Sequence, residues 1–209
     1  MATRLHAVYR SPRHNNKADP LDELVFIILS QMTTTPSFNR VFDRLKRSVR
    51  SWGELLVMPP RKIESLIKDA GLSHQKGPRL RRILKRVSAE FGRASLDSLH
   101  KMTDEDAEAF LTSLPGVGTK TAKCVMMYSL GRAVLPVDTH VARLACRLSV
   151  LSAADTTARA HVEIERAVRP ADRYSFHVNG VAHGQGVCRA VRPKCQACVL
   201  RRMCQHPEA

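Results

Sequence analysis

The sequence lacks the features that mark several other classes of protein. It has no transmembrane run, and residues 1–19, which are basic and polar, lack the apolar stretch of a secretory signal. It also has no convincing alternation of apolar and polar residues, no internal repeat and no low-complexity segment. We therefore expect an intracellular protein without strands, in which residues 1–19 are loosely structured.

Acidic residues are scarce. The chain has 19 Asp and Glu against 34 Lys and Arg, a formal net charge of +15. A field of this sign attracts phosphate and makes binding depend on salt, but it does not separate DNA from RNA or from an acidic membrane. The basic residues form two clusters. The first lies on one expected helix, where a solvated face explains it as well as DNA contact does: Arg79, Arg81, Arg82, Lys85 and Arg86. The second lies between two cysteines: Arg189, Arg192 and Lys194.

The apolar spacing predicts an all-α protein. With 209 residues, 44% of them hydrophobic, the chain can bury a core in one compact unit or in two small lobes. Residues 21–32 are apolar on several faces and predict a central buried helix. Further helices are expected over 37–49, 60–70, 78–91, 103–114, 119–130, 139–148, 157–168 and 172–184, with glycines 71, 92 and 131 as stops.

The segment Leu114-Pro-Gly-Val-Gly-Thr-Lys-Thr-Ala122 places an amine beside a glycine turn. Gly116 and Gly118 permit positive φ and close backbone approach, so their N–H groups can form an anion nest. The helix expected from Thr119 adds its positive N-terminal end, and Lys120 stands in its first turn. Taken singly, such a turn is usually only a turn, and such a lysine is usually solvated.

A carboxylate follows in Val137-Asp-Thr-His140. Asp138 comes after an extended stretch, at a good N-cap position for the helix expected over 139–148. Taken alone, it is most simply a helix cap.

The cysteines divide into two groups. Cys124 and Cys146 lie in amphipathic helices and are expected to be buried, unreactive thiols. For the remaining four cysteines, disulfides are disfavoured because an intracellular compartment is reducing. Structural zinc sites usually pair two short Cys-x-x-Cys motifs, and only one such motif is present here. Four thiolates in one loop also suit a cubane iron–sulfur cluster. The other four residues, separated by six, two and five positions, are Cys188, Cys195, Cys198 and Cys204.

The glycine turn with its lysine and the downstream Val-Asp-Thr-His resembles the helix-hairpin-helix (HhH-GPD) DNA glycosylase superfamily, and Lys120 resembles the lysine of its endonuclease III branch. In the adenine glycosylase branch that position is normally not a lysine. The resemblance implies an amine nucleophile at Lys120, an essential carboxylate at Asp138, and DNA contacts from Gly116, Gly118 and Thr119. The cysteine spacing matches the endonuclease III cluster loop, which implies a [4Fe-4S] cluster and phosphate contacts from Arg189, Arg192 and Lys194.

The resemblance also implies the architecture. We expect a six-helix barrel lobe over residues 20–133, with the helix-hairpin-helix motif at 114–122. Residues 1–19 and 134–209 would form an iron–sulfur cluster lobe with its loop at 188–204, and DNA would lie across the cleft between the lobes. A monomer in the cytoplasm or nucleoid is expected.

The first hundred residues depart from the family pattern. Endonuclease III has a motif like Ser-Ala-Gln-x-Thr-Asp, whose Gln fills the gap left by an extruded nucleotide. Here the stretch is Ser30-Gln-Met-Thr-Thr-Thr35, so either Gln31 or Met32 takes that role, and Thr35 replaces an acidic residue. Thr112 replaces a second acidic residue of the family pattern. Gly71-Leu72 does match the family's wedge, although for Leu72 alone a core position would be the simpler interpretation.

The resemblance implies a bifunctional DNA glycosylase/AP lyase of base excision repair. It would bind double-stranded DNA with damaged bases or abasic sites, remove oxidised pyrimidines and nick the strand by β-elimination. A non-catalytic or weakly active helix-hairpin-helix iron–sulfur paralogue is the alternative, and it would need neither Lys120 nor Asp138. A redox or DNA-charge-sensing protein would keep the cluster without needing the hairpin.

Overall fold

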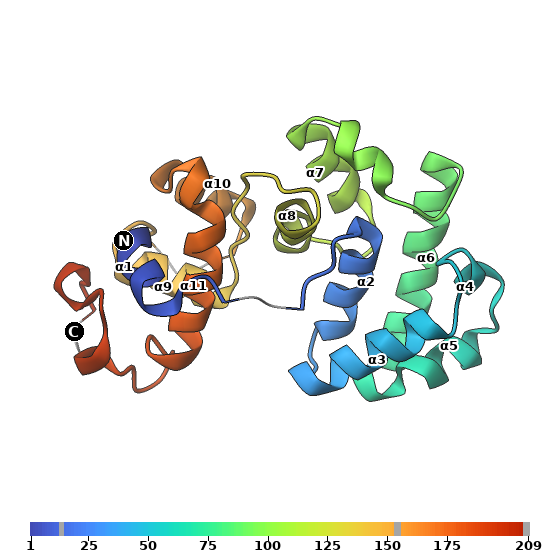
Figure 1. Cartoon of the computed structure of the whole chain (residues 1–209), viewed down its shortest axis with the longest axis horizontal. Coiled ribbons are helices and arrows are strands. Elements are labelled where there is room, and N and C mark those ends of the chain that lie inside the picture. The colour runs from blue at the N-terminus through green and yellow to red at the C-terminus, as the bar shows by residue number, and fades with distance from the viewer. Residues whose placement is uncertain (13–14, 153–155, 207–209) are drawn as a thin grey trace. The chain divides into compact units, whose positions relative to one another are not determined.

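The structure is a computed structural model that describes residues 1–12, 15–152 and 156–206; the side chain of Thr35 also lies outside the described part. The described residues form helices joined by loops, with no strand, which confirms the all-α class (Figure 1). The chain divides into two compact units. We call Asn15–Gly131 the hairpin unit, and Met1–His14 with Arg132–Ala209 the cysteine unit. No helix among the described residues is long and apolar enough to cross a bilayer.

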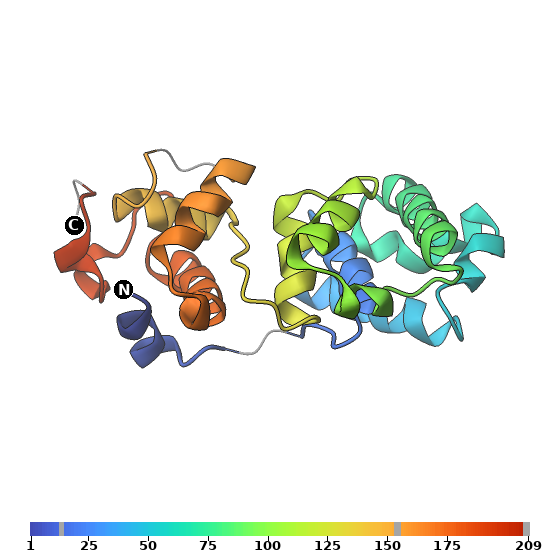
Figure 2. The ribbon, with the colours of Figure 1, turned by 90° about the horizontal axis from the view of Figure 1, so that it is seen from above.

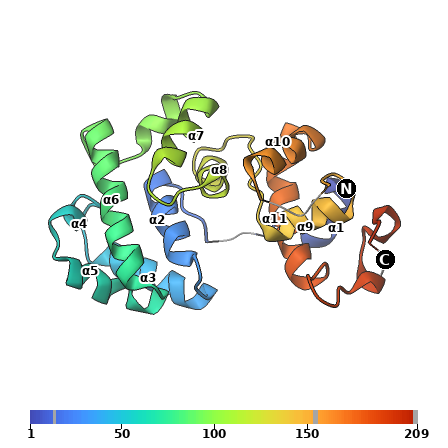
Figure 3. The same ribbon diagram turned by 180° about the vertical axis from the view of Figure 1, so that it is seen from behind.

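The hairpin unit is built around one buried helix. That helix, α2 (Pro20–Ser30), packs against α3, α6 and α8 (Figure 1, Figure 3). Its side chains from Pro20 to Leu29 are buried, with Asp22 as the exception, which confirms the predicted central helix. The remaining helices are α3 (Thr35–Arg47), α4 (Glu54–Val57), α5 (Pro60–Ile67), α6 (Ser73–Phe91), α7 (Asp104–Ser113) and α8 (Thr119–Tyr128), with short 3-10 turns at Lys68–Ala70 and Asp97–Lys101.

Helix α6 corrects one predicted boundary. The helix was expected to begin at Pro78, because proline favours first turns, but it begins at Ser73 and carries Pro78 inside it. Tertiary packing outweighs the lost backbone hydrogen bond, since Lys76, Gly77 and Leu80 of this first part are buried. A Cβ atom at Gly77 would lie 3.4 Å from Glu64 Cγ, so α6 approaches α5 closely here.

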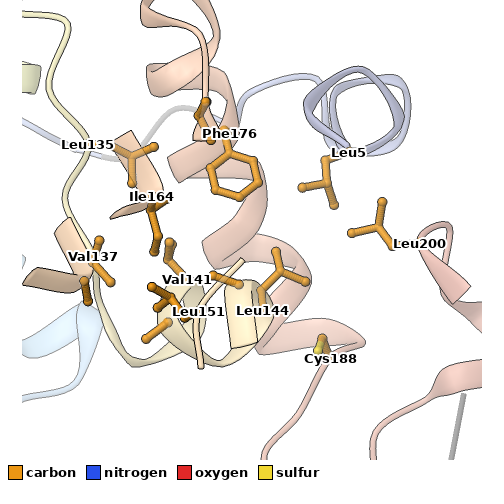
Figure 4. Close-up of a cluster of buried hydrophobic side chains, with 14 residues drawn as sticks. Leu5, Leu135, Val137, Val141, Leu144, Leu151, Ile164, Phe176, Cys188 and Leu200 are labelled. Atoms are coloured by element: carbon orange, nitrogen blue, oxygen red, sulfur yellow. The ribbon is translucent and has the colours of Figure 1, made fainter. Parts of the chain in front are cut away.

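The cysteine unit has its own core. Its helices are α1 (Ala2–Tyr9), α9 (Thr139–Arg147), α10 (Ala158–Ala167) and α11 (Arg173–Gly186), and the tail adds 3-10 turns at Cys195–Ala197 and Arg201–Met203. Helix α11 packs against α1 and α9. A Cβ atom at Gly184 would lie only 2.6 Å from His140 Cβ, so that contact requires glycine. The core side chains, shown in Figure 4, include Leu5, Val141, Leu144, Ile164 and Phe176.

Residues 1–19 were expected to be loosely structured, and this prediction was wrong for Ala2–Tyr9, which form helix α1. Helix α1 lies beside α11 (Figure 2), with Leu5 fully buried. The Tyr9 hydroxyl is 2.9 Å from His183 Nδ1, and Ser11 N donates to Asn179 Oδ1 at 2.8 Å. An eight-residue helix is marginal by itself. Packing against a helix far along the chain therefore stabilises it, and local sequence does not reveal such packing.

Candidate active site and cysteine loop

The glycine turn joins α7 to α8 and is anchored by two buried side chains. Leu114 and Val117 are both buried, and Val117 N donates to Leu114 O at 3.1 Å. Gly116 has φ +72°, in the left-handed region that glycine favours. Gly118 instead has φ −94° and is the N-cap of α8, without a side chain that caps the helix. Only one of the two glycines therefore uses the predicted left-handed conformation.

Lys120 lies in the first turn of α8, at this uncapped end. It is partly exposed, as is Thr119, while Gly116 and Gly118 are exposed. The backbone N–H groups of the first helical turn lack partners four residues back, so they suit an anion. The turn thus presents an amine beside a set of donors suited to a phosphate.

Arg79 connects this turn to the loop after α2, a link that the basic pattern of α6 did not reveal. A Cβ atom at Gly116 would lie 2.9 Å from Arg79 Nε, so the guanidinium packs directly on the glycine. Arg79 Nη1 also donates to Gln31 Oε1 at 3.0 Å. Gln31 is therefore held by its side-chain amide.

A buried lysine ties two loops together. Lys76 is 2% exposed, and its ammonium donates to Leu29 O at 2.9 Å, Gln31 O at 2.6 Å, Thr33 Oγ1 at 2.9 Å and Ala70 O at 2.7 Å. Burial, together with the nearby charge of Arg79, lowers the pKa of Lys76 from 10.5 to about 8. One ammonium thus fixes the loop after α2 relative to the loop before α6.

Each of these two loops exposes one apolar side chain on left-handed backbone. Met32 has φ +55° and is 87% exposed, and Leu72 has φ +51° and is 43% exposed. A Cβ atom at Gly71 would lie 3.7 Å from Met32 O, so the loops are neighbours. Leu72 is therefore not a core residue. Of the two candidates Gln31 and Met32, Met32 is the exposed one.

We expect Lys76→Met to lower the free energy of unfolding by about 2–4 kcal/mol near pH 7, because buried carbonyl oxygens lose their donor. The native pKa is below the unfolded value, so the unfolded state binds more protons between pH 8 and 10.5. Wild-type stability should therefore rise with pH across that window relative to the variant, by up to about 3 kcal/mol. Urea unfolding of both proteins at pH 7, 8, 9 and 10 measures this. A difference that stays constant with pH would contradict it.

Asp138 is the N-cap of α9, as its position predicted. Its Oδ1 accepts from His140 N at 3.0 Å and from Val141 N at 2.8 Å. The side chain is partly exposed. Asp138 belongs to the cysteine unit, whereas Lys120 belongs to the hairpin unit.

The four tail cysteines, here called the quartet (Cys188, Cys195, Cys198 and Cys204), line one cavity of about 280 Å³, a volume that includes its opening to solvent. All four are free thiols. Arg147 Nη1 donates to Cys188 Sγ at 3.2 Å, and His183 Nε2 lies 3.4 Å from Cys198 Sγ. Burial raises the pKa of the Cys198 thiol, and the other three members of the quartet raise it further.

The basic residues of this loop are exposed. Arg189, Arg192 and Lys194 all lie at the surface, and Arg192 has φ +50°. The loop backbone is fixed, because Cys188 N donates to His183 O at 2.8 Å and Lys194 N to Val187 O at 2.9 Å. By contrast, Arg81 in α6 donates to Leu56 O at 2.6 Å and has a structural role.

The sequence matches the family described as HhH-GPD superfamily base excision DNA repair protein over residues 25–170. The chain belongs to this superfamily. It is 31% identical to endonuclease III of Thermotoga maritima over 203 residues, 95% of this chain and 88% of that protein. It is also 33% identical over 166 residues to a putative DNA glycosylase of Arabidopsis thaliana, 79% of this chain but 56% of that one.

The fold of this HhH-GPD protein matches solved structures over nearly its whole length. A non-covalent endonuclease III–DNA complex superposes with a TM-score of 0.80 at 23% identity, covering 98% of this chain and 92% of that one. A thermostable thymine-DNA glycosylase gives a TM-score of 0.81 at 22% identity, covering 99% and 94%. Together with the sequence relatives, this confirms the predicted endonuclease III branch and its helix-hairpin-helix fold.

The quartet of this HhH-GPD protein does not converge on a single point. Among the described residues, no group of three or more His, Cys, Asp or Glu side chains lies close enough to hold one metal ion. A tetrahedral zinc site requires such convergence, whereas a cubane spreads one thiolate over each of four irons. Four free thiols around one cavity are the donor set that a cubane requires.

Proposed function

We propose that this protein is a bifunctional DNA glycosylase/AP lyase that removes oxidised pyrimidines from double-stranded DNA and nicks the strand by β-elimination. The observation that carries the proposal is the Lys120 amine in the first turn of α8, directly after a turn whose two glycines are exposed. A simple glycosylase uses water as its nucleophile and needs no amine there. The name of the Thermotoga maritima relative, endonuclease III, supports strand cleavage.

The chemistry follows from these groups. The damaged nucleotide is extruded from the duplex at a cost of a few kcal/mol, which weakened pairing reduces. Lys120 Nζ forms a bond to C1′ while the glycosidic bond breaks and its electron pair leaves with the base. Asp138 stabilises the positive charge that develops on the sugar. The C1′–O4′ bond then breaks, which opens the sugar ring and turns the C1′–N bond into a Schiff base. The Schiff base acidifies C2′, and loss of a C2′ proton drives β-elimination, which breaks the C–O bond on the 3′ side.

DNA binding divides between two kinds of contact. The backbone donors of Gly116, Gly118 and Thr119 bind a phosphate near the lesion. Met32 fills the gap left by the extruded nucleotide, because it is exposed while Arg79 holds Gln31 by its amide, and Leu72 inserts as the wedge. A thioether stacks on bases but does not read their edges by hydrogen bonds. We therefore expect little discrimination between opposite bases.

The quartet would hold a [4Fe-4S] cluster. With the cluster bound, residues 188–204 would be held in place, and Arg189, Arg192 and Lys194 would be available to phosphates on a rigid loop. Protein purified without oxygen should be brown and contain about four iron atoms per chain by metal analysis. Replacing Cys195 with serine should reduce both the iron content and the brown absorbance. Purified protein that carries zinc and no iron would contradict the cluster.

The exposed charges of the cysteine loop should contribute to DNA affinity whatever the sequence of the DNA. Arg192→Ala and Lys194→Ala should each weaken binding to damaged and undamaged duplexes alike, and lower the slope of log K against log salt by about one unit. Arg166→Ala is the matched control, because it removes one exposed charge of α10 and should leave the slope unchanged. Fluorescence anisotropy over a range of salt concentrations measures all three. Slopes equal to that of the wild type would assign Arg192 and Lys194 to the solvated surface.

The second candidate, a non-catalytic DNA-binding paralogue, is favoured by one observation. Thr112 stands where the family has an acidic residue, and its hydroxyl donates to Glu108 O at 2.7 Å within its own helix. It therefore contributes neither charge nor a free donor to a substrate. Release of thymine glycol by the wild-type protein separates the two candidates, because the paralogue would bind the duplex and release no base.

A further inference from the structure

Gln31 is bound by two cations of helix α6, each through a different oxygen. Its backbone O accepts from Lys76 Nζ at 2.6 Å, and its side-chain Oε1 accepts from Arg79 Nη1 at 3.0 Å. A guanidinium has donors and no acceptor, so the amide oxygen, and not the amide nitrogen, faces Arg79. The contact with Arg79 therefore decides where the Gln31 amide lies.

Arg79 is itself seated on the glycine turn. A Cβ atom at Gly116 would lie 2.9 Å from Arg79 Nε and 3.1 Å from both Cδ and Cζ, so the arginine fills the space that any other residue would need for its Cβ atom. Helix α2, which ends at Gln31, packs against both α6 and α8 (Figure 3). Because packing already restricts the arginine, its bond to Gln31 costs little further side-chain entropy.

The backbone of Gln31 is held independently of Arg79. The buried Lys76 binds Leu29 O at 2.9 Å as well as Gln31 O, and Thr33 N donates to Ser30 O at 3.2 Å. These bonds fix the loop from both sides of Gln31. Loss of the Arg79 side chain would release the Gln31 amide and leave the loop itself in place.

Gln31 and Met32 compete for the gap that an extruded nucleotide leaves. They are consecutive residues of one fixed loop, and the space of one nucleotide admits one of the two side chains. A free amide has two donors and an acceptor, so in the gap it can bond to the edge of the opposite base, whereas a thioether cannot. Which side chain enters therefore decides whether the opposite base is read.

We propose that Arg79 makes this enzyme indifferent to the base opposite the lesion. The inference rests on the proposed glycosylase function. Arg79 holds the Gln31 amide at the glycine turn, so the gap is left to Met32, which reads no base edge. Removal of the guanidinium frees the amide to enter the gap, where its donors and acceptor favour some opposite bases over others. Arg79 is a positioning residue, because it acts on the DNA through Gln31.

The relative strengths of the bonds favour this arrangement in the wild type. A bond from a charged donor is stronger than one between neutral groups, and typically shifts an equilibrium by about tenfold or more. To enter the gap, the Gln31 amide would give up its bond from Arg79 and gain bonds of the neutral kind to a base. Met32 gives up nothing comparable, since it is 87% exposed and a thioether is only a weak acceptor.

Arg79→Met tests the proposal, because methionine keeps an apolar stem on the glycine turn and removes every donor. Single-turnover base release is measured with thymine glycol opposite each of the four bases. Mispaired lesions are extruded more easily in any case, so each rate is divided by the wild-type rate on the same duplex. This relative rate should vary by about tenfold with the opposite base in Arg79→Met. It should be constant in Arg82→Met, which removes an exposed arginine of the same helix.

The double variant Arg79→Met/Gln31→Leu separates reading by the freed amide from a general loss of order. It has no amide, so its relative rate should again be the same for every opposite base, even if that rate is low. Gln31→Leu alone should give a constant relative rate too, because the amide is bound by Arg79 in the wild type. A merely structural role for Arg79 would lower the rate equally on every duplex, with or without Gln31.

Each failure has a distinct meaning. A constant relative rate in folded Arg79→Met, a varying one in Gln31→Leu, or equal variation in Arg79→Met and the double variant would overturn the inference, while the glycosylase function stands. If Arg79→Met does not fold, Gln31→Leu decides alone, and a constant relative rate there supports the inference. Wild-type protein that releases no base from any of these duplexes would overturn both.

Discussion

Lys120→Ala is expected to abolish the covalent adduct that borohydride traps between the wild-type protein and a duplex containing thymine glycol. The adduct requires a Schiff base, and a Schiff base requires an amine that can reach C1′. Binding should persist, because most phosphate contacts come from other groups, including the backbone donors of the glycine turn and the exposed residues of the cysteine loop. Gel analysis of trapped complexes, with affinity measured in parallel, gives both quantities.

The trapping experiment identifies the nucleophile only with a suitable lesion and a matched control variant. Abasic sites react with many amines, so only the thymine glycol duplex, whose base must first be released, is decisive. Lys62→Ala removes an exposed lysine of α5 and should trap as much adduct as the wild type. Trapping by Lys120→Ala at the level of this control would assign the nucleophile to another residue.

Asp138→Asn is expected to slow base removal by about 100- to 10,000-fold with little change in affinity, because the carboxylate charge acts on the cationic transition state rather than on the ground state. Asparagine is as good an N-cap as aspartate, so the bonds from His140 N and Val141 N should survive. Helix α9 therefore stays intact, and the variant isolates the charge.

Asp138→Ala is the companion variant for that experiment. It loses both the charge and the cap, and should cost about 1 kcal/mol of stability in addition to the rate. Single-turnover base release, with thermal unfolding of both variants, separates the two effects. Base release by Asp138→Asn at the wild-type rate would leave Asp138 as a helix cap and nothing more.

The parts of the site that could be predicted from sequence are local in the chain. A glycine with positive φ at Gly116, the start of α8 at Thr119 and the cap at Asp138 each depend on a few neighbouring residues, and all three were predicted correctly. The spacing of the quartet is local in the same sense, and its four members do line one cavity.

The parts that were missed depend on contacts between distant segments. Lys76 binds carbonyl groups on either side of α3 and α5, and Glu23 is held by a segment that had no predicted structure. The early start of α6 and the existence of α1 likewise depend on packing partners far along the chain. One signal was available in advance: charged residues within apolar stretches, such as Glu23 in α2, indicate buried groups with specific partners.

Mass spectrometry of the trapped wild-type complex tests the lyase proposal most directly. The protein is incubated with a duplex carrying one thymine glycol, reduced with borohydride, and digested with protease and nuclease. The account predicts a released damaged base, a strand cut on the 3′ side of the lesion, and a sugar remnant on the peptide that contains Lys120. Released base with an intact abasic strand and no modified peptide, or tight binding with no released base, would contradict it.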